Sequence, residues 1–179
     1  GRIGCEFYVH DGDIKVHDPA DNPLYHLILI AKNDKGYKNM IKLVSTAWCD
    51  GMYYKPRINF ELIKEHHDGL ICASACLGGE VLQHFLKDEK DEAYETAKRY
   101  KELFGDDYYI ELQDHNLDDQ KRTNPQLMKL AKELDIKMII TNDSHYLKKE
   151  DADAQDTLLC LYTNSKKDDE KRFSFPNNE

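Results

Sequence analysis

Residues 141–147 read TNDSHYL and directly follow a short apolar run at 138–140, which predicts a buried strand ending in polar residues. Asp143 and His145 are two residues apart, and on an extended chain such residues share one face of the strand. A carboxylate and an imidazole side by side could bind a metal ion or form an ion pair. This stretch alone leaves both interpretations open.

Three other strands carry metal-binding residue types in or just beyond them. Glu6 lies within the apolar run 3–9, Cys76 ends the run 70–76, and His115 follows the run 108–113. Glutamate, thiolate, imidazole and aspartate together form a suitable ligand set for zinc or manganese. The simpler alternatives are a buried core cysteine for Cys76 and a solvated loop histidine for His115.

The elements that must position these residues alternate between strands and helices. Apolar runs predict strands over 3–9, 26–31, 70–76, 108–113 and 138–143. Helical spacing predicts helices over 37–48, 59–66, 79–86, 91–104, 124–134 and 150–161, with Asn59 as a cap and Pro125 at a first helical position. The alternation predicts an α/β fold with a parallel sheet, doubly wound or closed into a barrel. In both architectures, functional residues gather at the C-terminal ends of the strands.

Composition limits the classes of protein and of site. The 179 residues are 40% hydrophobic and 33% charged, which is typical of a single globular domain, and a net charge of -9 argues against binding nucleic acid over the whole surface. The five cysteines lack zinc-finger spacing and fit a reducing cytoplasm. The sequence contains no membrane-length apolar run, signal peptide, glycine-rich phosphate loop, G-x-S-x-G or H-E-x-x-H motif. Both ends resemble cut ends, so we expect part of a longer protein.

Several stretches in order resemble the PHP (polymerase and histidinol phosphatase) domain of bacterial replicative DNA polymerase III alpha subunits. The resemblance rests on GCEFYV (4–9), YHLILIAKNDKGYKNMIKLVS (25–45), YYKPRI (53–58), GLICASACLGGEV (69–81), YYIELQDH (108–115), TNDSHYL (141–147) and EDADAQDTLLC (150–160). It implies a PHP-type distorted TIM-like barrel of parallel strands covered by helices. The barrel would be incomplete, because the first strands are missing, and residues 1–179 would form one partial PHP domain.

The resemblance also implies a metal cluster at the C-terminal face of the barrel, holding zinc, manganese or magnesium. Its ligands in this chain would be Glu6, Cys76, His115, Asp143 and His145. The family's H-x-H…D motif and a further histidine are expected upstream of the G-x-E strand and lie outside this chain, so we expect a partial or empty site. Arg57, in YYKPRI, is a candidate for binding a substrate phosphate, because a guanidinium pairs bidentately with phosphate oxygens. A surface salt bridge is its simpler alternative.

The implied function is a part of a DNA polymerase III alpha subunit in chromosomal replication. The domain would be either a metal-dependent phosphoesterase acting as a 3′–5′ exonuclease or a scaffold for the polymerase and its proofreading. Only the loop 10–23 separates the first two strands, which favours the type other than PolC. A free-standing phosphatase of the histidinol-phosphate kind is the alternative.

The resemblance implies further expectations about partners and about the isolated chain. DNA, replisome subunits and a proofreading exonuclease subunit would be partners, in the bacterial cytoplasm and without a membrane. The isolated chain should lack polymerase activity and show little nuclease activity, because the palm carboxylates and upstream histidines are absent. An uncovered sheet edge should expose apolar surface and favour self-association.

Overall fold

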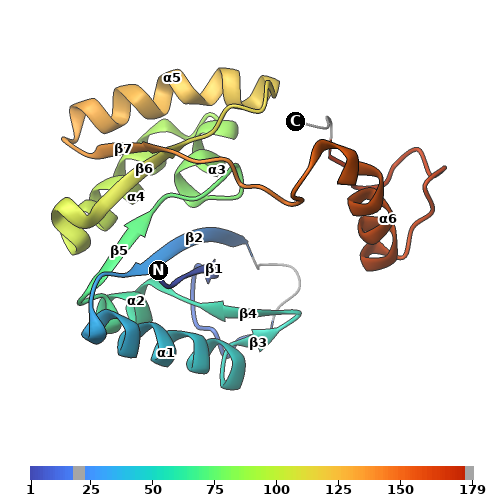
Figure 1. Ribbon diagram of the computed structural model, residues 1–179. Coiled ribbons are helices and arrows are strands. Elements are labelled where there is room, and N and C mark those ends of the chain that lie inside the picture. The colour runs from blue at the N-terminus through green and yellow to red at the C-terminus, as the bar shows by residue number, and fades with distance from the viewer. Residues whose placement is uncertain (18–22, 176–179) are drawn as a thin grey trace.

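A seven-stranded sheet lies at the centre of the computed structural model, which describes residues 1–17 and 23–175 (Figure 1). The strand order across the sheet is β3-β4-β1-β2-β5-β6-β7. The strands are β1 (Gly4–His10), β2 (Leu24–Ala31), β3 (Met52–Tyr53), β4 (Lys55–Ile58), β5 (Leu70–Ala73), β6 (Tyr108–Leu112) and β7 (Lys137–Ile140). The five expected strands are therefore present, and the hairpin β3–β4 is an addition.

The expectation of a parallel sheet was wrong for one of the five expected strands, β2. β1 pairs in parallel with β4, and β5, β6 and β7 pair in parallel with one another, but β2 is antiparallel to both β1 and β5. β3 is likewise antiparallel to β4. Parallel neighbours need a long crossover, usually a helix, whereas no helix of the described residues connects β1 to β2. β2 therefore starts at the edge of the sheet where β1, β5, β6 and β7 end.

In the described part of the chain, six helices accompany the sheet at nearly the expected positions. They are α1 (Asp34–Cys49), α2 (Phe60–His66), α3 (Glu80–Leu86), α4 (Lys90–Phe104), α5 (Asp118–Glu133) and α6 (Ala152–Thr163), with short 3-10 turns η1 (Gly105–Asp107) and η2 (Lys149–Asp151). Asn59 caps α2 as expected, because its side chain accepts a hydrogen bond from the Leu62 amide.

The expected start of α5 was wrong. Pro125 lies inside this helix, which already begins at Asp118, and the Asn124 side chain donates to the Gln113 carbonyl instead of capping a helix. A proline inside a helix removes one backbone hydrogen bond. The helix continues because its other turns bury Leu127 and Leu130 completely in the core.

The core lies between the sheet and helices α1 to α5. Fully buried side chains from the sheet (Leu29, Ile58, Ile110) pack with those from the helices (Leu43, Leu127) in one apolar cluster. Helix α1 approaches the chain before β5 so closely that a Cβ atom on Gly36 would lie 1.8 Å from the Gly69 carbonyl oxygen. Only glycine permits this contact.

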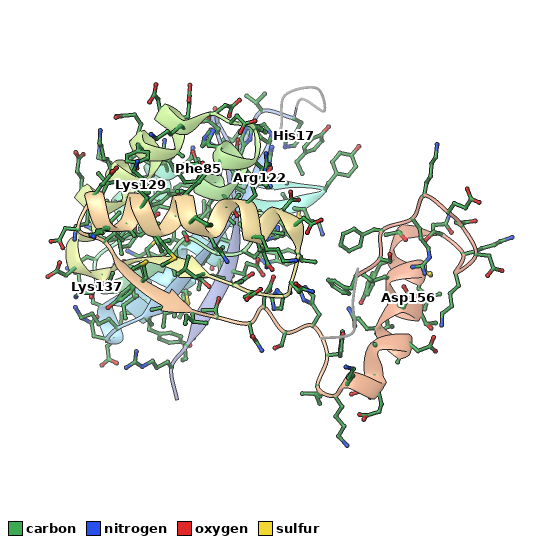
Figure 2. The ribbon with its side chains drawn as sticks, turned by 90° about the horizontal axis from the view of Figure 1, so that it is seen from above. His17, Phe85, Arg122, Lys129, Lys137 and Asp156 are labelled. Atoms are coloured by element: carbon green, nitrogen blue, oxygen red, sulfur yellow. The ribbon has the colours of Figure 1, made fainter. Side chains whose placement is uncertain are left out.

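The outer strand β7 and the C-terminal segment are less well covered. In Figures 1 and 2, α6 is set apart from the sheet and from α5. In Figure 2 the label Asp156 marks α6 and the label Lys129 marks α5. Ile140 on β7 is 86% exposed and Leu147 beyond it is 97% exposed. Within the described residues the sheet is open, with β3 and β7 as its edges. The expected α/β fold with an incomplete barrel and exposed apolar surface is confirmed. No helix of the described residues is long and apolar enough to cross a membrane.

Candidate metal centre

Glu6, His26 and Cys76 form a cluster at the edge where the parallel strands end. His26 Nδ1 lies 2.8 Å from Glu6 Oε1 and 3.4 Å from Cys76 Sγ, and the three potential ligand atoms all lie within 4.8 Å of one another. Glu6 comes from β1, His26 is the third residue of the antiparallel β2, and Cys76 comes from the loop after β5. Carboxylate, imidazole and thiol groups at this spacing can share one metal ion.

The backbone around His26 holds its ring in place. The His26 amide donates to the Gly78 carbonyl at 2.9 Å, and the edge of the Tyr8 ring packs against the imidazole with centroids 5.2 Å apart. A Cβ atom on Gly78 would lie 2.9 Å from His26 Nδ1, so glycine is required for this close approach. The loop that carries Cys76 therefore also fixes the position of His26.

The cluster changes the pKa values of two of its members. The hydrogen bonds to Cys76 and Glu6 raise the pKa of His26 to about 10, despite its partial burial. The hydrogen bond to His26 lowers the pKa of the Glu6 carboxyl, and the charge of His145 contributes in the same direction. The metal-free cluster is thus a charged, hydrogen-bonded group near neutral pH.

We expect the metal-free protein to lose stability as the pH rises above neutrality. The pKa of His26 is higher in the folded chain (about 10) than its ordinary value of 6.5, so its stabilising contribution is complete below pH 6.5 and disappears as the pH approaches 10. Urea unfolding with a chelator at pH 7 and pH 9 should show a loss of roughly 1 kcal/mol or more from this group. His26→Gln should decline less over this range, and equal declines in both proteins would contradict the assignment.

Glu111 on β6 connects the loops around the cluster. Its two carboxylate oxygens accept from the Ala75 amide at 3.0 Å and from the Thr141 hydroxyl at 2.6 Å, while its own amide donates to Ser74. Burial raises the pKa of the Glu111 carboxyl, and the charges of Asp143 and Glu6 raise it further. Glu111 therefore ties the chain after β5 to the chain after β7.

Most of the residues expected at the site line one cavity. The cavity measures about 720 Å³, and His26, Cys76, His115, Asp143 and His145 are among its lining residues. Glu6 is not among the lining residues and reaches this region through its contact with His26. The strand ends thus bring together the expected residues, and their role as ligands stays a prediction.

The expected strand alternation does not explain how these residues are oriented. β7 ends at Ile140, and Asp143 has a left-handed backbone with φ 50°, so Asp143 and His145 do not lie on an extended chain. His145 Nδ1 lies 2.7 Å from the Asp143 carbonyl oxygen. The nearby Gln120 holds His115, through hydrogen bonds to its amide and to Nδ1.

The loop that carries Cys76 also departs from the expected strand. β5 ends at Ala73, and Ala75 has a positive φ of 63°. A left-handed residue interrupts the alternation of faces, so Cys72 and Cys76 need not share a face. Cys72 is fully buried in the core, whereas Cys76 faces the cavity.

The proposed phosphate contact at Arg57 was wrong. Arg57 is 0% exposed, and its guanidinium donates to the carbonyls of Gly51, Ile14 and Val16. The guanidinium also lies 5.2 Å from the Tyr53 ring centroid. A fully buried side chain bonded to the main chain has no surface for a phosphate, and these contacts are not a surface salt bridge. Arg57 lies in β4, and its hydrogen bonds instead connect the loop after β1 to the β3–β4 hairpin.

The sequence interpretation missed His26. It treated this residue as the start of the strand 26–31, on the assumption that every strand ran in the same direction. The short connection between the first two strands was the available signal, because it favours an antiparallel neighbour. The antiparallel direction places His26, the third residue of β2, opposite Tyr8 in β1 and two residues before Ile28, which pairs with the last residue of β5, Ala73.

The donor atoms of the cluster suit some metals better than others. Imidazole nitrogen and thiolate sulfur are ligands for zinc and related transition metals, whereas magnesium takes oxygen ligands almost exclusively. Among the three metals expected, zinc therefore fits Glu6, His26 and Cys76 best.

Comparison with known proteins identifies the family. The PHP domain model matches residues 2–115, which include Glu6, His26, Cys76 and His115. The chain is 45% identical, over 99% of its length, to the DNA polymerase III subunit alpha of Treponema pallidum and 46% identical to that of Deinococcus radiodurans, again over 99% of the chain. It is 41% identical to the same subunit of Borreliella burgdorferi. The chain spans about 15% of the length of these relatives. Its fold and its match over residues 2–115 show that the chain belongs to the PHP domain family.

Proposed function

We propose that this chain is the PHP domain of a bacterial DNA polymerase III alpha subunit and that its cavity is a metal-dependent site for phosphate esters. The observation that carries the proposal is the cluster of Glu6, His26 and Cys76, whose ligand atoms lie within 4.8 Å of one another. The cluster lies inside the range matched by the PHP family.

The residues divide into metal-holding and cavity-lining groups. Glu6, His26 and Cys76 would hold the first ion, while Asp143 and His145 line the same cavity and are our candidates for holding a second. His115 is a weaker candidate, because it is not part of the close cluster of ligand atoms. A bound divalent ion would supply positive charge to polarise a phosphoryl oxygen.

The cavity also offers groups that suit a phosphate ester. Lys148 and Lys149 are among its lining residues, and lysine ammonium groups attract phosphate. Aromatic and apolar residues such as Tyr146 and Phe175 form another part of the lining, on which a base or sugar could rest. The cavity thus combines metal ligands, cations and an apolar wall.

The biological setting is proposed from the relatives. Proteins named DNA polymerase III subunit alpha match 99% of this chain, which supports DNA and replisome subunits as partners, together with a cytoplasmic location. A proofreading exonuclease subunit is a further partner that we propose. Within this assembly the domain would act as a 3′–5′ exonuclease or support the polymerase and its proofreading.

A free-standing phosphatase of the histidinol-phosphate kind is the second candidate. The cavity does not discriminate between the two, because a metal cluster and a phosphate site would serve both. The identity of 45% to a polymerase subunit over 99% of the chain favours the polymerase setting. Rapid hydrolysis of histidinol phosphate by the isolated chain, with no need for DNA, would favour the phosphatase.

Cobalt binding provides a direct test of the proposed site. Co²⁺ takes the same ligands as zinc, and a cobalt–thiolate bond adds an absorption band in the near ultraviolet. We expect this band in the wild-type chain, a change in the spectrum when thymidine monophosphate is added, and no band in Cys76→Ser. Cys49→Ser is the matched control, because Cys49 is an exposed cysteine at the end of α1. A band that survives Cys76→Ser, or a spectrum that the nucleotide does not change, would contradict the proposal.

A further inference from the structure

A row of side chains leads from the proposed metal centre to the β3–β4 hairpin. The Tyr8 ring packs edge-on against His26 with centroids 5.2 Å apart, and Lys55 Nζ lies 5.3 Å from the centroid of the same Tyr8 ring. Lys55 in turn pairs with Tyr53 across the hairpin. The surface of the hairpin is therefore continuous with the cluster of Glu6, His26 and Cys76.

Tyr54 forms the tip of this hairpin. It stands between the paired residues Tyr53 and Lys55, its backbone is left-handed with φ 57°, and it is 80% exposed. A left-handed backbone costs a residue with a side chain about 1 kcal/mol, which glycine would avoid. Folding alone therefore does not account for a large exposed aromatic ring at this position.

The ring next to Tyr54 is supported from two directions. Tyr53 stacks on His17, with centroids 4.7 Å apart and an angle of 10° between the planes, and the Arg57 guanidinium lies 5.2 Å from its centroid. The Tyr54 ring packs edge-on against Tyr53 at 4.6 Å. His17 lies at the periphery of the molecule in Figure 2. Tyr54 thus projects from a packed base of aromatic and guanidinium groups.

We propose that Tyr54, Lys55 and Tyr8 form a binding site for single-stranded DNA beside the metal centre. Proteins that bind single strands alternate aromatic rings, on which bases stack, with cations that contact the phosphates. Tyr54 supplies the exposed ring, Lys55 supplies the cation, and Tyr8 continues the surface to His26. A base would stack on Tyr54, the phosphates would contact Lys55, and the strand would continue toward the cluster of Glu6, His26 and Cys76. This inference rests on the proposed function, because it places a substrate strand next to that site.

Fluorescence anisotropy with a short fluorescein-labelled oligothymidylate tests this site. The measurement uses the whole chain at low salt with a chelator, so that the metal centre does not contribute. Tyr54→Ala should weaken binding about fivefold or more, because stacking of one base on an aromatic ring has that effect or a larger one. Tyr54→Phe should bind like wild type, since it keeps the ring. Lys55→Gln should reduce the salt dependence of log K by about 0.7, the value for one lost phosphate contact on a single strand.

Tyr162→Ala is the matched control, because this tyrosine is 86% exposed on α6, outside the proposed site. It should leave the affinity unchanged. No oligonucleotide binding by the wild type, wild-type affinity in Tyr54→Ala, or equal losses in both tyrosine variants would overturn the inference. Wild-type affinity in Tyr54→Ala would point to a protein partner for the hairpin.

The two proposals fail in different ways. If Tyr54→Ala keeps both the cobalt band and the oligonucleotide affinity, the inference about the hairpin fails and the metal site stands. If Tyr54→Ala loses oligonucleotide affinity while Cys76→Ser keeps its cobalt band, the hairpin inference holds for DNA binding and the proposed metal site fails. Thermal unfolding of each variant checks that the fold is retained.

Discussion

Replacement of His26 by alanine should lower the zinc affinity of the chain by about 100-fold or more. His26 Nδ1 is the atom that contacts both Glu6 Oε1 and Cys76 Sγ, so its removal leaves only two donors near the centre of the cluster. Loss of a residue that merely orients a ligand costs 10–100-fold in metal affinity, and the loss of a ligand should cost more. Isothermal titration with zinc chloride in a weakly coordinating buffer measures the change.

Two further histidine variants make this result interpretable. His115→Ala should reduce zinc affinity less than tenfold, because His115 is not part of the close cluster. His67→Ala, at the C-terminal end of α2 and outside the cluster, should have no effect. An unchanged affinity in a folded His26→Ala protein would exclude the cluster as the zinc site. A larger loss in His115→Ala would restore the ligand set expected from the sequence.

Replacement of Arg57 by leucine should lower the free energy of unfolding by about 3 kcal/mol or more. The guanidinium is fully buried and donates to the carbonyls of Gly51, Ile14 and Val16. Leucine would leave these acceptors without this donor, and hydrogen bonds to charged groups contribute about 1.5–3 kcal/mol each. Urea unfolding followed by circular dichroism measures the loss.

The controls for Arg57 separate a structural role from a phosphate-binding role. Arg57→Lys should be intermediate, because an ammonium group cannot reproduce the fork of guanidinium donors. Arg2→Gln, at an exposed position, should change the stability by less than about 0.5 kcal/mol. A stable Arg57→Leu protein with impaired binding of thymidine monophosphate would reverse our interpretation and return Arg57 to the phosphate site.

The sequence by itself determined the order of the elements, the family and the edge at which the site lies. Apolar periodicity and caps predicted the five principal strands and the presence of the helices, including the cap of α2 at Asn59. These signals are local, because a strand or an amphipathic helix shows its buried face in its own residues. Polar residues such as Cys76 and His115 at the strand ends then indicated the cavity-lining edge.

Only the tertiary structure decided the direction of β2, and with it the place of His26. An apolar run reads the same in both directions, so its pattern does not show whether a strand is parallel or antiparallel to its neighbours. The left-handed backbones at Ala75 and Asp143 were equally hidden, since neither turn is marked by a glycine. They redirect the chain after β5 and β7 toward the cavity.

The burial of Arg57 was also decided by the tertiary structure. A charged residue in a polar stretch is ordinarily exposed, and its burial depends on carbonyl groups that another segment brings to it. Here Ile14 and Val16, more than 40 residues away in the sequence, supply two of those carbonyls. The sequence therefore specified which residues were available for chemistry. Which of these residues meet was decided by the pairing of β1 with β2 and by the packing of the loop on Arg57. The pairing and the packing both depend on contacts between distant segments.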